Sequence, residues 1–315
     1  MQNPLKNKGS LTSKGLLLVL STAFISGFAI FINKLGVKEF NPYLFTFFKN
    51  LLVAGFLVGL LLGLKELKNL KKLTKKDWSI LAIIGLVGGS IPFLLFFKGL
   101  SLTNAANGAF IHKTMFIYVA ILAGLFLKEK IPSRLLIAGA FLLMGNLYFL
   151  KFLPVGIQQG DLLILTATVL WAVENTISKY ALKTLSPRIV AFGRMGIGSI
   201  FILLFLIFTG NIGSVSKLTS LHFQWILISA VILFGYVTTW YTGLKYINVS
   251  TATVILLLGS PITSLLTFIF QGQGFTQTQA IGSVLLAFGV ALAIGFGTLR
   301  QFVRNLPKLV YESRA

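Results

Sequence analysis

The sequence predicts an all-α polytopic membrane protein with ten transmembrane helices, arranged as two inverted five-helix repeats. Of its 315 residues, 56% are hydrophobic and only 11% are charged, a balance that is typical of membrane proteins and not of soluble domains. Apolar stretches long enough to cross a hydrocarbon layer of ~30 Å follow one another along the chain. A set of charged, proline and glycine positions also recurs once, about halfway along.

The predicted spans are joined by short connections. At a rise of ~1.5 Å per residue, about 20 apolar residues cross the hydrocarbon layer as a helix. The runs of that length cover residues 15–33, 43–64, 78–100, 104–127, 133–151, 161–183, 187–209, 223–246, 249–270 and 277–298. The first span follows a basic tail of residues 1–14, and the longest cytoplasmic connection, 65–77, is rich in lysine. Connections of this length indicate no large soluble domain.

The distribution of basic residues predicts which way the chain crosses the membrane. If the N-terminus lies in the cytoplasm, most of the 28 lysines and arginines fall in cytoplasmic loops and in a basic C-terminal tail of residues 299–315. The positive-inside rule therefore predicts a multi-pass protein of the plasma membrane with both termini cytoplasmic. This topology explains the formal charge of +21, so nucleic acid is not an expected partner.

An internal repeat divides the chain into two halves, residues 15–151 and 161–298. One set of positions recurs at a constant offset: Lys34, Pro42 and Lys49 return as Lys179, Pro187 and Arg194. A second set recurs at an offset one residue shorter: Gly99, Leu100, Asn104 and Gly145 return as Gly243, Leu244, Asn248 and Gly289. Each half holds an odd number of spans, so the second half is inverted relative to the first. Inverted repeats are typical of secondary transporters, whose site lies near the midplane between the halves.

Several residues, most of them in the second half, also carry a family resemblance. They are Trp171, Asn175 and Lys179 in the sixth span, Pro187 and Arg194 at the start of the seventh, and Ser260 and Pro261 in the ninth, together with the run FLKEKIP containing Glu129 after the fourth span and a glycine-rich tenth span. With them the chain resembles the drug/metabolite transporter superfamily, EamA type, over nearly its whole length. Two positions depart from the repeat: Ile117 stands where the second copy has Pro261, and Gln273 where the first has Glu129. The resemblance implies transport of amino acids, sugars, nucleotide sugars or other metabolites.

Lys113 is the costliest residue for a membrane helix, since it lies near the middle of the fourth span, beside His112. An ammonium group at the bilayer midplane costs at least ~2.5 to 3.5 kcal/mol, so it is expected to face a partner or a wet cavity. We predict that Lys113 binds an anionic substrate group; the alternative is a structural lysine tied to carbonyl groups or to one acid. Neighbouring helical positions differ in direction by about 100 degrees, so His112 is predicted either to join the site or to pack as a hydrogen-bonded core residue.

Glu174 is the only one of the seven acids that lies well inside a predicted span, so it is the carboxylate candidate for proton coupling. Arg194 lies at a similar depth on the next span. An ion pair between these two is the structural alternative, and a contact of Glu174 with Lys113 is the functional one. Lys49 is the repeat mate of Arg194 and is predicted at a mirrored depth, near the opposite face. Lys49 and Arg194 are therefore gating candidates, with snorkelling or loop-tying cations as the alternative.

Aromatic residues complete the candidate substrate site. Phe96, Trp240 and Tyr241 precede the repeated Gly-Leu pairs of the third and eighth spans and are predicted to form apolar or stacking walls. An interfacial belt is the alternative for them, because tryptophan and tyrosine are enriched there. Trp171 lies on the face of the sixth span that carries the acid, and Ser260 joins the set through the resemblance.

These observations predict a secondary carrier that moves a small polar metabolite, an amino acid or another carboxylate, by alternating access, with export as the direction that the resemblance implies. A carrier of phosphorylated or nucleotide-linked substrates is the alternative, since cations outnumber acids within the spans. A membrane-embedded enzyme or a channel is the alternative of another class. No catalytic residue, cofactor or metal site is predicted, because the chain has no cysteine and only two histidines. The expected partners are the small-molecule substrate and the lipid bilayer, in a monomer or a homodimer.

Overall fold

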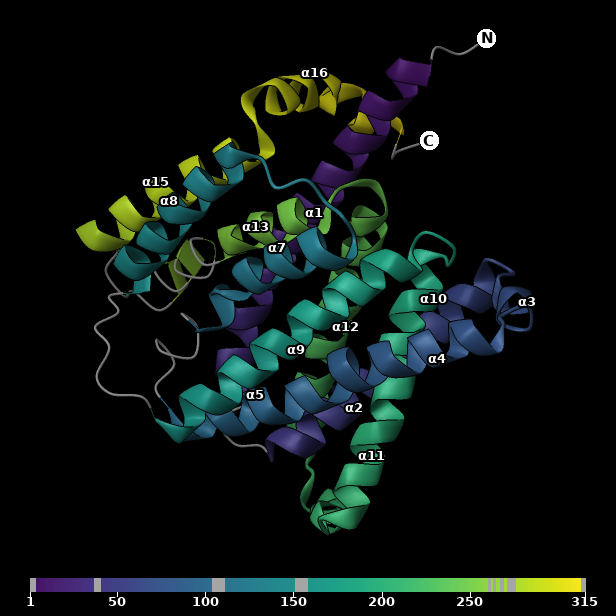
Figure 1. Cartoon of the computed structure of the whole chain (residues 1–315). Helices are drawn as coiled ribbons and strands as arrows, with labels where there is room; N and C mark the ends of the chain where they lie inside the picture. The colour runs from purple at the N-terminus through teal and green to yellow at the C-terminus, as the bar shows by residue number, and fades with distance from the viewer. Residues whose placement is uncertain are drawn as a thin grey trace.

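The chain folds as a bundle of helices, shown by a computed structural model (Figure 1). The structure describes residues 4–36, 41–103, 111–150, 158–259, 262, 265–266, 269–270 and 276–312. No β-strand occurs in these ranges. The predicted all-α class is confirmed.

The first half of the chain supplies five membrane segments. Its elements are α1 (Pro4–Gly36), α2 (Pro42–Gly63), α3 (Leu67–Leu70), α4 (Lys75–Ile84), η2 (Gly85–Ser90), α5 (Ile91–Leu102), α7 (Met115–Phe126) and α8 (Ser133–Leu150). Local sequence sets the helix starts, because the first N–H groups of a helix lack intrahelical partners. The Asn41 side chain accepts hydrogen bonds from the N–H groups of Tyr43 and Leu44 at the start of α2. Thr74 and Asp77 form a capping box at α4.

The second half repeats this order. Its elements are α9 (Gln159–Ala181), α10 (Pro187–Phe192), η3 (Gly193–Ile197), α11 (Gly198–Phe208), η4 (Asn211–Lys217), α12 (Ser220–Tyr246), α13 (Val249–Ile255), η5 (Leu256–Leu258), α15 (Gln277–Ile294) and α16 (Phe296–Glu312). A π-helical turn interrupts one membrane segment in each half, at η2 and at η3. Such turns are rare and are frequent at functional sites.

The described helices coincide with the predicted spans. Seven of them are long and apolar enough to cross a membrane: Leu11–Ala29, Pro42–Gly63, Lys75–Gly99, Gln159–Ala181, Pro187–Phe208, Ser220–Tyr246 and Gln277–Ile294. Three shorter apolar helices, Ile111–Phe126, Ser133–Tyr148 and Val249–Leu258, fall in the remaining predicted spans. Parts of the predicted spans 104–127 and 249–270 lie outside the described residues.

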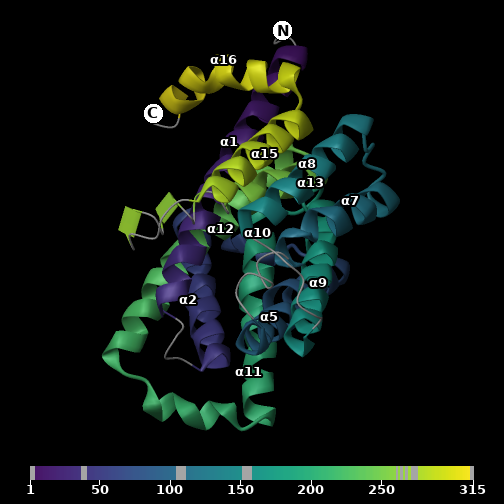
Figure 2. The ribbon, with the colours of Figure 1, turned by 90° about the vertical axis from the view of Figure 1, so that its left-hand side faces the viewer.

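The packing of the helices follows the inverted repeat. The third segment packs along the sixth, as α5 on α9, and the mates of these two, the eighth and the first, pack as α12 on α1. The fifth and tenth segments, α8 and α15, are mates and pack on each other (Figures 1 and 2). The repeat mates Gly145 and Gly289 lie in this contact, where a Cβ at Gly145 would come within 2.9 Å of the Leu286 nitrogen. The repeat found in the sequence is therefore also a repeat of contacts.

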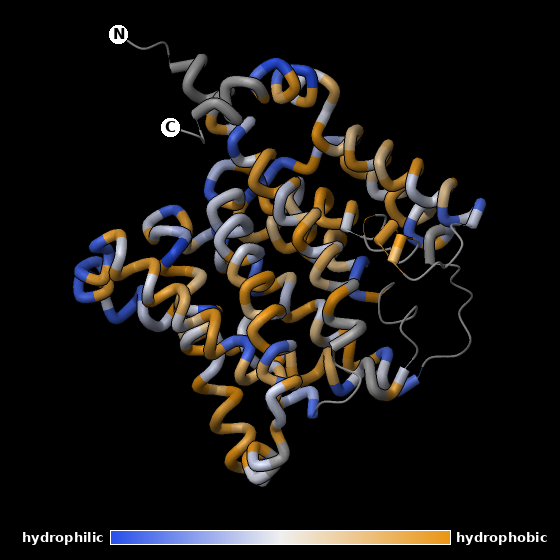
Figure 3. The backbone as a smooth tube through the Cα atoms, turned by 180° about the vertical axis from the view of Figure 1, so that it is seen from behind, coloured by the Kyte–Doolittle hydropathy of each residue, from blue (hydrophilic) through white to orange (hydrophobic). Residues whose placement is uncertain are grey.

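Apolar side chains cover the outside of the bundle. Figure 3 shows hydrophobic residues along the outer helices as well as the inner ones. Phe208 is 85% exposed and Phe126 is 72% exposed. Contiguous apolar surface of this kind marks an interaction surface in a soluble protein, and in a membrane protein it is the surface that faces lipid tails.

Glycines at small-xxx-small spacing predict close helix packing in two places, and the structure confirms one of them. Gly85 and Gly89 lie against η3, and a Cβ at Gly89 would come within 1.9 Å of the Arg194 carbonyl oxygen. The glycines at 55, 59 and 63 on α2 have no atom of another element within 4 Å of a Cβ, so for them the prediction is wrong within this chain. Glycines at the same spacing thus lie on a face of η2 that packs inside the bundle and on a face of α2 that points out of it.

The last membrane helix ends before the predicted boundary, and a further helix follows it. The predicted tenth span reaches residue 298, but α15 ends at Ile294 because Gly295 has a φ of +88° and turns the backbone out of the helix. The predicted tail of residues 299–315 is helical as far as Glu312, within α16. Helix α16 crosses the end of the bundle where α1 begins (Figures 1 and 2).

Candidate functional site

A buried ion pair with two hydroxyl groups lies at the centre of the second half. Glu174 on α9 is 0% exposed, and its Oε2 lies 3.6 Å from NH1 of Arg194 on η3. The other carboxylate oxygen, Oε1, accepts hydrogen bonds from the Tyr241 hydroxyl at 2.6 Å and from the Ser178 hydroxyl at 2.6 Å. Arg194 NH1 also donates to the Tyr241 hydroxyl at 3.2 Å. Of the two partners expected for Glu174, the structure places Arg194 beside it.

The carbonyl group of Gly88 joins this ion pair to the first half of the chain. It accepts a hydrogen bond from Arg194 Nε at 3.3 Å and another from Trp171 Nε1 at 3.1 Å. A Cβ at Gly88 would come within 2.2 Å of the Glu174 side chain, so a larger residue there would displace the carboxylate. Gly88 is not among the predicted site residues, and the run of glycines in η2 is the sequence signal that points to it.

Trp171 and Trp240 are both tied to Asn175. The Asn175 side-chain nitrogen donates to the Trp171 carbonyl oxygen at 2.8 Å, and Trp240 Nε1 donates to the Asn175 side-chain oxygen at 3.0 Å. Trp240 is 1% exposed and Tyr241 is 0% exposed, so both lie inside the bundle and not in an interfacial belt. The bond to Asn175 therefore holds the indole ring of Trp240 on α12, whereas the indole ring of Trp171 on α9 is held by its bond to the Gly88 carbonyl group.

An aromatic cluster lies next to this network. The rings of Phe96, His112 and Trp171 contact one another in pairs, with centroids 5.2 to 5.4 Å apart. His112 is thus packed among aromatic rings. Lys113, the next residue, is 8% exposed and makes no hydrogen bond or ion pair with the residues that the structure describes.

Lys49 on α2 is the second buried ammonium group at this site. It is 3% exposed and faces the rings of Phe45, Phe93 and Phe97, with its nitrogen 5.1 to 5.2 Å from their centroids. A cation over an aromatic face is attracted by the ring quadrupole, by ~2 kcal/mol when desolvated. Among the described residues no carboxylate pairs with it.

The repeat mates Lys49 and Arg194 meet at one ring. The Arg194 guanidinium carbon lies 5.9 Å from the centroid of Phe93, and the Lys49 nitrogen lies 5.2 Å from it. The sequence placed these two cations near opposite faces of the membrane, and the structure corrects this. Phe93 also contacts Trp171, with centroids 5.3 Å apart, so the site extends continuously from Lys49 to His112.

Two further points from the sequence concern Ser260, predicted in the substrate site, and metal binding. Ser260 lies outside the described residues. Within the described part of the chain, no group of three or more histidine, aspartate and glutamate side chains is placed to hold a metal ion. What the described side chains bring together is a cluster of cations and aromatic rings around one carboxylate, contributed by both halves of the chain.

A helical membrane bundle of two inverted halves, with a buried charged and aromatic site between them, defines a membrane transporter of the inverted-repeat class. The chain belongs to the EamA-like transporter family, whose model matches residues 13–150 and 158–295, one match for each half. The predicted family and repeat are confirmed.

Relatives over the whole length carry transporter names. The chain is 28% identical to an uncharacterized transporter of Archaeoglobus fulgidus, over 88% of this chain and 96% of that one. It is 26% identical to the uncharacterized transporter YyaM of Bacillus subtilis, over 89% and 93%, and 28% identical to the riboflavin transporter ImpX of Fusobacterium nucleatum, over 88% and 96%. A solved crystal structure superimposes with a TM-score of 0.75 at 17% identity, over 89% of this chain and 97% of the other, so the fold is shared.

Proposed function

We propose that this transporter is a secondary carrier of a small anionic metabolite, an amino acid or another carboxylate, which it moves out of the cell across the plasma membrane by alternating access. The observation that carries the proposal is the pair of buried ammonium groups, Lys49 and Lys113, for which the described residues supply no carboxylate. The carboxylate at the centre, Glu174, is already beside Arg194. Unpaired buried charge is expensive, so an anionic substrate is the natural counterion.

Each site residue has a role in this proposal. Lys113 binds the anionic group of the substrate, and the aromatic cluster beside it forms an apolar wall. Lys49 and Arg194, which meet at Phe93, change partners as the two halves rock about the site. Glu174 takes up a proton when Arg194 turns towards the substrate, which couples transport to the proton gradient. Trp240 and Tyr241 complete the wall on the side of the second half.

A planar aromatic substrate is the second candidate. The cluster of Phe96, His112 and Trp171, whose ring pairs are edge-to-face or tilted, offers stacking partners for a flat ring. The relative named as a riboflavin transporter adds support, since it matches over 96% of its own length. A substrate that combines a flat ring with a phosphate or carboxylate would use both features of the site.

A binding panel on purified protein tests both candidates. The panel contains amino acids, dicarboxylates, phosphorylated sugars, nucleotides and riboflavin, and ligand-dependent thermal stabilisation is measured. Lys113→Ala is expected to weaken binding of an anionic ligand by roughly 2 to 4 kcal/mol, about 30- to 700-fold, because a charge-assisted bond is lost. Lys113→Arg restores part of it, since a planar fork does not replace a compact charge.

Two control variants separate the alternatives. Lys71→Ala removes a lysine from an exposed loop and is expected to leave affinity unchanged. Phe96→Ala is expected to weaken a ring substrate by ~0.5 to 1.5 kcal/mol beyond the lost contact area, and to spare one without a ring. A folded Lys113→Ala protein with the affinity of the parent for every anionic ligand would refute the anion site.

A further inference from the structure

The last helix, α16, lies outside the part of the chain that the transporter family accounts for. The family match ends at residue 295, and α16 begins at Phe296. Gly295, with a φ of +88°, lets the backbone leave the last membrane span in one residue. Helix α16 therefore begins at the level in the membrane where α15 ends, and it packs against α1 and α15. It crosses the end of the bundle (Figure 1).

One side of α16 is fixed on the protein. Phe302 is 7% exposed and belongs to the buried core, and Leu299 and Leu306 are half-buried against that core. These residues recur at helical spacing, so they form one stripe along the helix. The contact with the bundle fixes the direction in which the remaining sides of α16 face.

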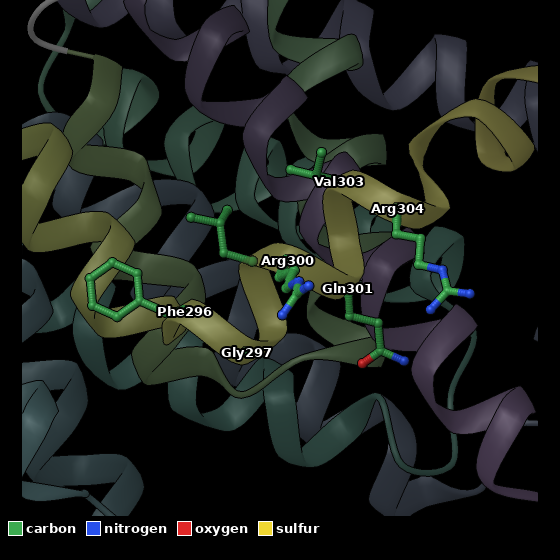
Figure 4. A pocket seen from close by; sticks show the side chains of 7 residues that line it. Phe296, Gly297, Arg300, Gln301, Val303 and Arg304 are labelled. Carbon is green, nitrogen blue, oxygen red and sulfur yellow. The ribbon is translucent and has the colours of Figure 1, made fainter.

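Beside this stripe, α16 carries an apolar edge that the protein leaves uncovered. Phe296 is 60% exposed and Val303 is 59% exposed. Arg300 and Arg304 are also exposed. Arg300 lies about one helical turn after Phe296, and Arg304 lies one turn after Arg300, so the two arginines form a stripe beside the apolar edge. Figure 4 shows these four side chains on α16, where, with Gly297, Leu299 and Gln301, they line the open space around the helix.

The charge of this surface has one sign. In the sequence of α16 the acid is Glu312, at the last position, and the charged residues before it, Arg300, Arg304 and Lys308, are all basic. The guanidinium of Arg134, at the start of α8, lies directly against Gly295 and adds a further positive charge where α15 turns into α16. An exposed apolar edge next to a basic stripe is the composition of a helix that lies in the membrane interface.

We propose that α16 is an interfacial helix that binds the headgroups of anionic phospholipids in the cytoplasmic leaflet. Phe296 and Val303 enter the boundary of the acyl chains, and Arg300 and Arg304 hold lipid phosphate groups. The bilayer is the occupant because α16 continues directly from a membrane span and because its exposed charges are complementary to anionic lipid. The positive-inside rule places this end of the bundle at the negatively charged leaflet. The proposal does not depend on the transported substrate.

The depth of the apolar edge is tested with spin labels, since the chain has no cysteine. Variants V303C and Q301C of the full chain are labelled and placed in phosphatidylglycerol vesicles. The V303C label is expected to respond mainly to oxygen, which partitions into lipid, and the Q301C label mainly to a water-soluble nickel complex, because the two positions lie on nearly opposite sides of the helix. A V303C label that meets the nickel complex as freely as the Q301C label overturns the proposal.

The lipid preference is tested by titrating phosphatidylglycerol or phosphatidylcholine into detergent-purified protein and following thermal stability. A lysine or arginine at the surface contributes about fivefold, from ~1 kcal/mol, to attraction by anionic lipid. The R300Q/R304Q variant is therefore expected to need about 30 times more phosphatidylglycerol to reach half of its stabilisation. The K71Q/K72Q variant, which loses the same charge from an exposed loop, is the matched control. An unchanged midpoint in R300Q/R304Q, or an equal shift in the control, overturns the proposal.

Discussion

The turn between α12 and α13 is held from both sides by side chains of other segments, which we call the α12–α13 clamp. Lys179 Nζ donates hydrogen bonds to the carbonyl oxygens of Leu244 at 2.5 Å and Ile247 at 2.7 Å. The Glu129 carboxylate accepts from the N–H groups of Val249 at 3.0 Å and Ser250 at 3.4 Å, and from the Ser250 hydroxyl. The Lys179 cation thus pairs with the last carbonyl groups of α12, and the Glu129 anion pairs with the first N–H groups of α13. The dipoles of the two helices favour this arrangement of charge.

We expect Lys179→Met to open this turn. A hydrogen bond to a charged group contributes ~1.5 to 3 kcal/mol, and Lys179 makes two of them in a half-buried position, so a loss of ~2 to 4 kcal/mol follows. At ~1.4 kcal/mol per factor of ten, the open fraction of the turn rises about 30- to 700-fold. Glu129→Gln keeps one oxygen acceptor and loses the charge, so its effect is expected to be smaller, ~1 kcal/mol.

A buried reporter cysteine measures the opening. Val249 is 0% exposed, and in V249C a hydrophilic maleimide reacts only when the turn opens, with no other thiol in the chain. The labelling rate of V249C is expected to rise by the same factor in the Lys179→Met background. Lys183→Met, which removes a neighbouring exposed lysine, is the matched control. If Lys179→Met changes the labelling rate by less than about threefold, the clamp does not hold the turn.

Three further outcomes are expected. Glu174→Gln leaves Arg194 as an uncompensated buried cation and is expected to cost ~3 to 5 kcal/mol of stability in thermal unfolding, partly recovered in the double variant Glu174→Gln/Arg194→Gln. A stable single variant that has lost only proton-driven transport would show instead that Glu174 serves coupling alone. Gly89→Ala meets a backbone oxygen and is expected to destabilise by ~1 to 3 kcal/mol, whereas Gly59→Ala meets open space and is expected to be neutral or stabilising by up to ~1 kcal/mol, so equal midpoints of unfolding would contradict this packing. A cysteine placed at Lys71 is expected to react with an impermeant reagent only in opened cells, and labelling of intact cells would reverse the predicted topology.

Features that can be counted along the sequence predict much of the architecture. Apolar runs fix the spans because every lipid-exposed backbone group must bond within its own helix. The repeat is fixed by two offsets that differ by one residue, one between Lys34 and Lys179 and the other between Gly145 and Gly289. The inversion follows from the odd number of spans in each half. These are counts along the chain, so they require no knowledge of which helices touch.

The candidate site needed the tertiary structure. Lys49 and Arg194 are mates in the sequence, but only packing brings both to the ring of Phe93. The role of Gly88 depends on a carbonyl that two segments share. A helical pattern gives the face on which a side chain lies, and it does not give the helix that this face meets.

The same limit explains the expectations that failed. Glycine spacing on α2 and on η2 looks alike, yet only η2 crosses another helix closely enough to need it. For Trp240 and Tyr241 the interfacial belt was the alternative to a substrate wall, and the burial that excludes the belt follows from the helices packed around α12. The sequence by itself therefore determined the spans, the repeat and the family, because these depend on periodicity and hydropathy along one chain. The tertiary structure alone decided which charges meet and which surfaces stay open, because those depend on contacts between segments distant in sequence.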